Sequence, residues 1–252
     1  MVCPNFKFEK SIWKNGYRII AGCDEVGRGS IAGPVVAGCV VYDKSQISGF
    51  SSPVLVNKKT DYRNLKTEKP VFINDSKKLT QKQRETARIW IKKHCLVYGI
   101  GTASSKVIDK KGIVKATEKA FRRAISSAET KLGKKIEFLL VDAFYIPYIK
   151  GIPMARKRYR RGKLSNGEID FISRQTAIID GDQKSFSIAS ASIIAKVFRD
   201  SLMVRLSQDP RYKKYGWDKN KGYGSKLHRE MILNKGISTH HRKSFCSKLI
   251  SN

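Results

Sequence analysis

Apolar residues along the chain fall into short runs and helical repeats, separated by polar stretches. The short runs, rich in β-branched and aromatic residues, predict strands. They cover residues 17–23, 35–42, 95–103, 138–141 and 177–179. Apolar or small residues that recur every three or four positions predict helices after residue 80, over 113–132, over 188–206 and over 226–233. The first 16 residues are weakly patterned, so we expect an arm that leads into the first strand.

Residues typical of helix ends support this division. Thr80 and Gln83 fit a capping box, and Gly133 stands where a helix is expected to end. Strands that alternate with helices indicate a mixed α/β sheet flanked by helices. Polar stretches near 45–68 and 148–172 interrupt the pattern as inserts, and the second carries seven basic residues and no acidic one between Lys150 and Lys163.

Two adjacent acids, Asp24 and Glu25, follow the first predicted strand and lead into the glycine-rich turn Gly27-Arg28-Gly29. Consecutive side chains of a strand point to opposite faces, so the two acids cannot both lie in the core. At least one must point to water, a metal or a basic partner. The glycines allow positive φ angles and a close approach of backbone amides to a ligand. A hairpin with a polar turn is the alternative interpretation, and an isolated Asp-Glu pair does not exclude it.

Two further acids occupy comparable positions, since Asp142 ends a predicted strand and Asp182 precedes a predicted helix. Each has a simpler interpretation, as a loop cap or as a helix N-cap. If strand ends bring such carboxylates together, they repel one another unless a cation neutralises them. Mg²⁺ or Mn²⁺ suits such a site because both prefer oxygen ligands.

Charge indicates the class of partner. The 252 residues hold 51 Lys and Arg against 21 Asp and Glu, a formal net charge of +30. Such a charge is too large for an ordinary enzyme of small neutral substrates and favours a polyanion, with nucleic acid as the leading candidate. It would suit a non-catalytic nucleic-acid-binding protein equally well.

Neither a membrane span nor a signal peptide is evident, so we expect a cytoplasmic protein. The five scattered cysteines lack zinc-site spacing and are expected to be free thiols, mostly buried.

Three blocks of sequence resemble the type 2 ribonuclease H family, ribonuclease HII. They are GCDEVGRGSIAGPVVAG at 22–38, VDA at 141–143 and GDQKSFSIASASIIAKVFRD at 181–200, in the order of the family. The resemblance covers most of residues 17–245 outside the inserts, and Ala143 departs from it because glycine is usual there. It implies a ribonuclease H-like fold with a C-terminal helical extension. It also implies two divalent ions, Mg²⁺ or Mn²⁺, held by Asp24, Glu25, Asp142 and Asp182.

The resemblance also implies substrate contacts. Gly27, Arg28 and Gly29 would read the ribose 2′-hydroxyl, and Tyr223 would pack on the sugar at a ribo-to-deoxyribo junction. The positions near the substrate phosphates are Lys77, Ser192 and Lys196. Without the resemblance, Gly27–Gly29 would be interpreted as an ordinary turn and Tyr223 as a surface aromatic residue. The simpler interpretations of Lys77, Ser192 and Lys196 are solvated charges or caps.

Two other features have simpler interpretations. Asp200 is expected to pair with a neighbouring Lys or Arg and not to bind metal. His240 and His241 invite a zinc or general-base interpretation, which we disfavour because no Cys or Asp lies at ligand spacing.

The expected protein is thus a monomeric endoribonuclease that cleaves the RNA strand of RNA–DNA hybrids. By resemblance it also cuts 5′ of single ribonucleotides in duplex DNA, leaving 5′-phosphate and 3′-hydroxyl ends. We expect a catalytic domain over 1–205 and a basic substrate-binding extension over 206–252. The alternatives are a non-catalytic binding protein on the same fold and an enzyme restricted to long hybrids. The second requires loss of Tyr223 or of the Gly27–Gly29 turn, and both are present.

Overall fold

A five-stranded mixed sheet forms the centre of the protein. The computed structural model describes residues 3–47, 71–153 and 168–250. The strand order is β3-β2-β1-β4-β5, with β2 antiparallel to β1 and β3, and with β4 and β5 parallel to β1. The strands are β1 (Ile20–Val26), β2 (Val35–Tyr42), β3 (Val97–Ala103), β4 (Phe138–Asp142) and β5 (Gln175–Ile178). All five predicted strands are confirmed, and β1 begins three residues later than predicted and continues through both acids.

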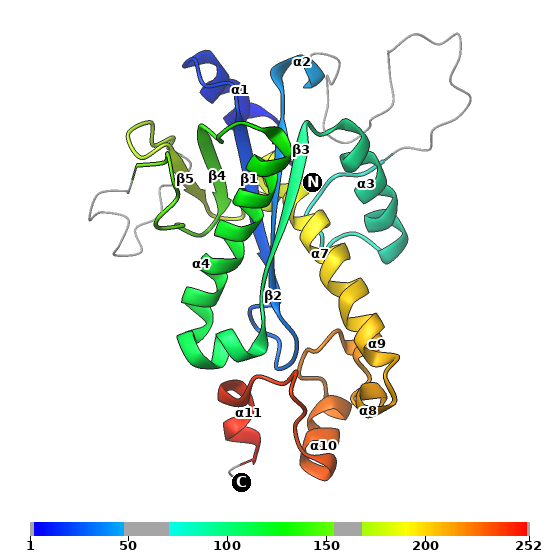
Figure 1. Ribbon diagram of the computed structural model, residues 1–252. Helices are drawn as coiled ribbons and strands as arrows, with labels where there is room; N and C mark the ends of the chain where they lie inside the picture. Colours follow the sequence, from blue (N-terminus) through cyan, green and yellow to red (C-terminus); the bar gives the residue numbers. More distant parts are fainter. Residues whose placement is uncertain (1–2, 48–70, 154–167, 251–252) are drawn as a thin grey trace.

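Helices cover both faces of the sheet (Figure 1). On one face lies α4 (Ser105–Leu132), and on the other lie α7 (Phe186–Ser207) and α3 (Gln81–His94). The capping box of Thr80 and Gln83 is confirmed, as is the end of α4 at Gly133. The helix α4 starts earlier than predicted but breaks at Gly112, so its second part matches the predicted 113–132.

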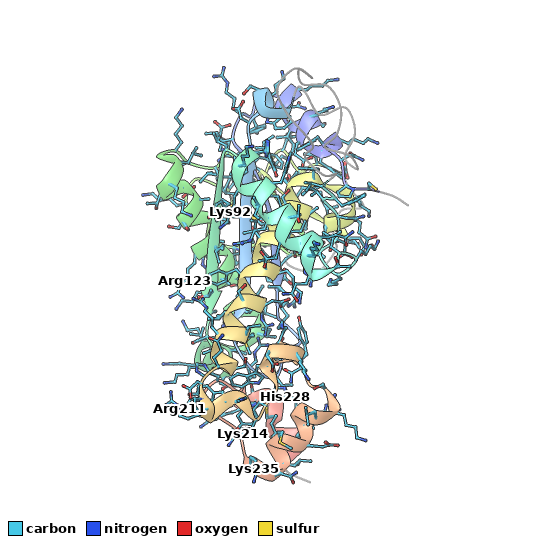
Figure 2. The ribbon with its side chains drawn as sticks, turned by 90° about the vertical axis from the view of Figure 1, so that its right-hand side faces the viewer. Lys92, Arg123, Arg211, Lys214, His228 and Lys235 are labelled. Atoms are coloured by element: carbon cyan, nitrogen blue, oxygen red, sulfur yellow. The ribbon has the colours of Figure 1, made fainter. Side chains whose placement is uncertain are left out.

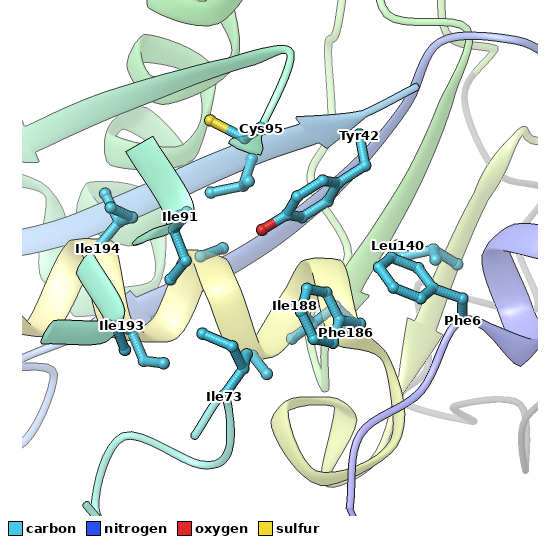
Figure 3. Packing of buried hydrophobic residues seen from close by; sticks show 14 of the residues in the cluster. Phe6, Tyr42, Ile73, Ile91, Cys95, Leu140, Phe186, Ile188, Ile193 and Ile194 are labelled. Atoms are coloured by element: carbon cyan, nitrogen blue, oxygen red, sulfur yellow. The ribbon is translucent and has the colours of Figure 1, made fainter. Parts of the chain in front are cut away.

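Each face of the sheet has its own apolar core. The core beneath α7 and α3 includes Phe6, Tyr42, Ile91, Phe186 and Ile193, which pack together in Figure 3. The core beneath α4 contains small residues of that helix with alternate residues of β1, β2 and β4. Because both faces are covered, β2 is apolar and buried along its whole length.

The prediction of an N-terminal arm is wrong, because Lys7–Lys14 form the helix α1. Its Glu9 is buried and accepts hydrogen bonds from the hydroxyls of Ser185 and Ser187 and from the Ser187 amide. Burial raises the pKa of Glu9 despite these bonds. The helix has only two turns, and the buried Glu9 interrupts its apolar face, so the sequence signal was weak.

The helical C-terminal extension is confirmed, but it contains more helices than the one predicted over 226–233. Its helices are α8 (Pro210–Lys213), α9 (Trp217–Asn220), α10 (Lys226–Lys235) and α11 (Lys243–Ile250). Trp217, Tyr215 and Ile232 form its core with Met203 of α7 and Ala32. Two of these helices have only four residues, too few for a helical repeat to show in sequence.

Both predicted inserts lie largely outside the described residues. Of the first, the structure describes a short helix, α2 (Lys44–Ile47), and of the second, residues 148–153 and 168–172. Among the described residues, no helix is long and apolar enough to cross a membrane. None of the five cysteines, all within the described residues, forms a disulfide bond, and all except Cys3 are buried, as expected.

The helix α7 approaches the sheet backbone directly at Gly22 and Gly38. A Cβ on Gly22 would lie 2.1 Å from the Ser187 carbonyl carbon, and one on Gly38 would lie 2.4 Å from the Ala191 carbonyl oxygen. The contacts are with backbone atoms, which cannot move aside as a flexible side chain can. Glycine at these positions therefore sets the distance between α7 and the strand that carries Asp24.

We expect Gly22→Ala to lower the free energy of unfolding by roughly 3 kcal/mol, because the added methyl group would push α7 from the sheet. Urea unfolding measures this. The control is Gly29→Ala, whose Cβ would meet no atom within 4 Å and whose stability should stay near that of the parent. Equal stability of the two variants would contradict the packing argument.

Candidate active site

Three of the four predicted carboxylates meet at one edge of the sheet. One oxygen from each of Asp24, Asp142 and Asp182 lies within 4.8 Å of the others. The register explains this for the first two, since Cys23 of β1 pairs with Val141 of β4 and the acids are the next residues on parallel strands. Asp182 lies in the short helix α6 (Gly181–Lys184), which follows β5, the neighbour of β4.

The fourth acid, Glu25, lies beside this group and bonds to the following turn. Its Oε1 accepts from the Arg28 guanidinium at 3.3 Å, whereas its Oε2 is buried and has no hydrogen-bond partner among the described residues. Burial raises the pKa of Glu25, with Arg28 opposing the change and Asp142 adding to it. An unpartnered buried carboxylate oxygen next to three clustered carboxyls suits a divalent cation.

The electrostatics of the cluster favour the same interpretation. Burial and the charges of Glu25 and Asp142 raise the pKa of Asp24 well above its ordinary value. Burial and the charges of Asp142 and Asp75 raise the pKa of Asp182 to about 7. Asp142 has a raised pKa through burial, although its Oδ1 accepts from the Gly181 amide at 2.7 Å. Neutralisation by a bound cation would relieve this repulsion.

A fifth acid, Asp75, was missed by sequence reasoning. It is buried, its side chain hydrogen-bonds with Asp182, and its Oδ1 accepts from the Lys77 amide at 2.9 Å. Asp75 lies two residues before the predicted Lys77, in the sequence NDSKKL at 74–79, so that motif could have indicated it.

The predicted Lys77 faces the acidic cluster. Burial lowers the pKa of Lys77, but the charges of Asp182, Asp75, Asp24 and Asp142 outweigh burial and raise it. The ammonium group therefore stays charged beside the carboxylates.

Of the two predicted residues of α7, Ser192 contacts the acidic cluster and Lys196 lies near Tyr223. The Ser192 hydroxyl is 2.9 Å from that of Ser76 and hydrogen-bonds with Asp24, which opposes the increase in the pKa of that acid. Lys196 bonds to Asp200 at 3.0 Å, which confirms Asp200 as part of a structural pair.

Two buried arginines support the Gly27–Gly29 turn from below, and sequence reasoning missed both. Gly27 has φ +89°, and a Cβ there would lie 2.2 Å from Arg199 Nε. Arg242 donates to the carbonyl oxygens of Gly27 and Arg28. The position of Arg199 on the buried face of α7 was a usable signal, whereas nothing near Arg242 in sequence suggests its role.

Tyr223 follows Gly222, whose carbonyl accepts from the amides of Ile31 and Ala32. Its ring lies 5.4 Å from the Arg199 guanidinium carbon and 5.8 Å from the Lys196 ammonium. Tyr223 is 38% exposed. An exposed ring held next to the turn and to α7 is available for stacking on a sugar.

Ala143 adopts φ +40°, in the left-handed region that favours glycine. This explains why glycine is usual at this position in the family that the chain resembles. The chain reverses here, directly after Asp142.

His228 and His241 form a buried pair in the C-terminal extension. His241 contacts His228, and among the described residues the only group of three or more clustered metal-ligand side chains is that of Asp24, Asp142 and Asp182. The zinc interpretation of His240 and His241, which we disfavoured, gains no support.

Fold and site together define a class: metal-dependent nucleases with a ribonuclease H-like sheet. Residues 53–248 match the family model of ribonuclease HII. The chain therefore belongs to the ribonuclease HII family, and it is a metal-dependent ribonuclease with ribonuclease H activity on RNA–DNA hybrids. The non-catalytic alternative is set aside.

A curated relative agrees with the family assignment, and two solved structures share the fold. Ribonuclease HII of Alkaliphilus oremlandii is 36% identical over 249 residues, which cover 98% of this chain and 100% of the relative. The solved ribonuclease H2 of Pyrococcus horikoshii has a TM-score of 0.63 and 24% identity, covering 92% of this chain and 97% of its own. Bst-RNase HIII, solved in complex with Mn²⁺, has a TM-score of 0.63 and 17% identity, covering 94% and 70% of the two chains.

The raised carboxyl pKa values predict how metal-free stability depends on pH. Asp182 changes from an ordinary 3.8 to about 7 on folding, so its contribution to stability is present at low pH and is lost as pH rises through about 7. In chelator at pH 8, Asp182→Asn should melt about 2–4 °C above the parent, with no difference near pH 4.

With added Mn²⁺ at pH 8, the parent should melt above Asp182→Asn, because only the parent keeps all its proposed carboxylate ligands. Differential scanning fluorimetry measures both melting temperatures. A parent protein more stable than Asp182→Asn in chelator at pH 8 would contradict the repulsion within the cluster.

Proposed function

We propose that this ribonuclease, besides cleaving the RNA strand of hybrids, incises duplex DNA 5′ of a single embedded ribonucleotide. The products would carry 5′-phosphate and 3′-hydroxyl ends. The observation that carries this proposal is the contact between the Gly27–Gly29 turn, Arg199 and Tyr223, beside the carboxylate cluster. An enzyme that needed only a long RNA strand would have no use for two sugar-reading elements held together.

Ribose reading follows from the chemistry of the turn. A 2′-hydroxyl both donates and accepts hydrogen bonds, and backbone groups next to a glycine can approach it without hindrance from a Cβ. We propose that Gly27, Arg28 and Gly29 read this hydroxyl and that Tyr223 stacks on the adjacent sugar.

We propose that Asp24, Glu25, Asp142 and Asp182 hold two divalent ions, Mg²⁺ or Mn²⁺, and the Mn²⁺ complex of Bst-RNase HIII supports this choice. Ions held by these four residues would supply activation of water and stabilisation of the departing 3′-oxygen. The chain itself would hold the scissile phosphate with Lys77 and orient Asp24 through Ser192. Lys196 would bind a neighbouring phosphate, while Asp200 keeps its ammonium group in place.

The C-terminal extension, residues 206–252, is proposed to hold the flanking duplex, with 1–205 as the catalytic domain. Arg211, Lys214 and Lys235 project from it, and Lys92 and Arg123 project from α3 and α4 on the side shown in Figure 2. All proposed site residues come from one chain, which supports activity as a monomer.

The decisive assay presents a short DNA duplex with one ribonucleotide, with Mg²⁺, Mn²⁺ or chelator. We expect metal-dependent incision 5′ of the ribonucleotide, and mapping of the product ends by gel and phosphatase treatment tests the end chemistry. Cleavage of RNA–DNA hybrid without any incision of this duplex would refute the proposal.

We expect Asp24→Asn to reduce hybrid cleavage by about a thousandfold or more, because several kcal/mol of metal-ion stabilisation are lost. Hybrid binding should be retained, since the basic surface is unchanged, and fluorescence anisotropy measures it. The matched control, Asp43→Asn, removes an acid just after β2 and should cleave normally. Full activity of Asp24→Asn would show that the metal site lies elsewhere.

A further inference from the structure

The Gly27–Gly29 turn is anchored through its carbonyl oxygens, which leaves the edge that carries Arg28 and Gly29 exposed. The Arg242 guanidinium donates to Gly27 O at 2.6 Å, to Arg28 O at 2.7 Å and to Gly33 O at 3.1 Å. Arg242 itself is fully buried. One side chain thus holds both ends of the loop that follows β1.

Arg242 has no carboxylate within ion-pair distance among the described residues, and neither has Arg199. Burial and the charge of Arg199 lower the pKa of Arg242 to about 9. Burial of two neighbouring cations without a counterion is unfavourable. Core packing alone would be better served by an apolar side chain, so the guanidinium is needed for the carbonyls it binds.

Arg199 connects the same loop with the segment that carries Tyr223. It donates to Pro34 O at 3.0 Å, to Ala32 O at 3.1 Å and to Lys221 O at 2.8 Å. Its guanidinium also faces the Tyr223 ring. The two sugar-reading elements are therefore attached to one another from α7.

His241, the residue before Arg242, is connected with Tyr223 by hydrogen bonds through His228. His228 Nδ1 donates to the Tyr223 carbonyl at 2.8 Å, which leaves His228 Nε2 as an acceptor. That atom receives Trp217 Nε1–H at 3.0 Å and lies 3.0 Å from His241 Nε2. His241 Nδ1 accepts from the Ser238 amide at 2.9 Å, which assigns the His241 proton to Nε2. His241 Nε2–H and Trp217 Nε1–H then share the single lone pair of His228 Nε2.

The backbone of this segment completes the connection. Gly33 donates to the His240 carbonyl at 2.8 Å, Arg242 donates to the Ile31 carbonyl at 2.9 Å, and His241 forms a bridge with Ala32. Residues 240–242 thus behave as a short strand added to the loop after the turn.

We propose that His241 and Arg242 form a recognition latch, which fixes the Gly27–Gly29 turn and Tyr223 in one relative position. Neither residue touches substrate, and both are positioning residues. The inference rests on the proposed function, since it assumes that the turn and Tyr223 read the ribose together.

The latch matters most when a substrate offers one ribose. An embedded ribonucleotide presents a single 2′-hydroxyl. The turn must therefore bind this hydroxyl while Tyr223 stacks on the sugar of the 3′ neighbour. An RNA strand presents a hydroxyl at every register, so a displaced turn still finds one. Loss of the latch therefore changes substrate preference, whereas a general loss of folded protein lowers both activities equally.

The experiment measures kcat/KM on two duplexes, one with a single ribonucleotide and one with a full RNA strand, and takes their ratio. We expect Arg242→Gln and Arg242→Lys to lower this ratio at least about tenfold, because hydrogen bonds from a charged donor to buried carbonyls are lost. The control Arg18→Gln removes an exposed cation at the opposite end of the sheet and should leave the ratio unchanged.

His241 permits a matched pair of variants. The amide of Gln can replace Nε2–H and keep the bond to His228, whereas Asn can replace only Nδ1 and loses that bond. We expect His241→Asn to lower the ratio and His241→Gln to keep it closer to that of the parent. Faster amide hydrogen exchange at residues 27–29 in Arg242→Lys, measured by mass spectrometry, is the expected structural counterpart.

The outcomes separate this inference from the proposed function. A parent enzyme that never incises the single-ribonucleotide duplex refutes the proposed function. A parent that incises it, with unchanged ratios in the Arg242 and His241→Asn variants, refutes the latch alone. Failure of both Arg242 variants to fold would also count against the latch, because it would make Arg242 a residue of general stability.

Discussion

The direct contact between α7 and the backbone of β1 and β2 is the constraint on which this structure depends. Glycine at positions 22 and 38 lets the helix lie where side chains would otherwise separate it from the sheet. That distance brings Ser192 to Asp24 and places Arg199 beneath the Gly27–Gly29 turn. It also brings the end of α7, with Met203, into the core of the C-terminal extension. One helix thus connects the carboxylate cluster, the turn and the extension.

The second theme is the placement of charge. Within a chain of net charge +30, three acids gather at one edge of the sheet, in a group that could hold a metal ion. Asp24, Asp142, Asp182 and Asp75 repel one another there, and Lys77 stays charged because of them. The buried arginines show the opposite arrangement, since Arg199 and Arg242 meet backbone carbonyls. Charge that would destabilise an ordinary core here organises the site and the turn beside it.

Much of the candidate site could be predicted because its residues stand in continuous motifs. Asp24, Glu25 and the turn are adjacent in sequence, and Asp142 and Asp182 stand where a strand ends and a helix begins. Their types and positions left simpler interpretations open, and the resemblance of these motifs to the family singled them out. Asp75, Arg199 and Arg242 were missed because their roles come from contacts with distant residues. Arg242, for example, binds carbonyls more than 200 positions away in sequence. Helix α1 was missed for the same reason, as Glu9 finds its partners at the start of α7.

The amino-acid sequence by itself predicted the strands, the main helices and a polyanionic partner, and its family motifs singled out four candidate metal-binding acids. Each of these depends on local pattern, composition or a contiguous motif. Only the tertiary structure decided that three carboxylates lie within 4.8 Å of one another, that Asp75 joins them and that two buried arginines support the turn. Such distances are set by strand register and by the close packing of α7, which no single stretch of sequence contains.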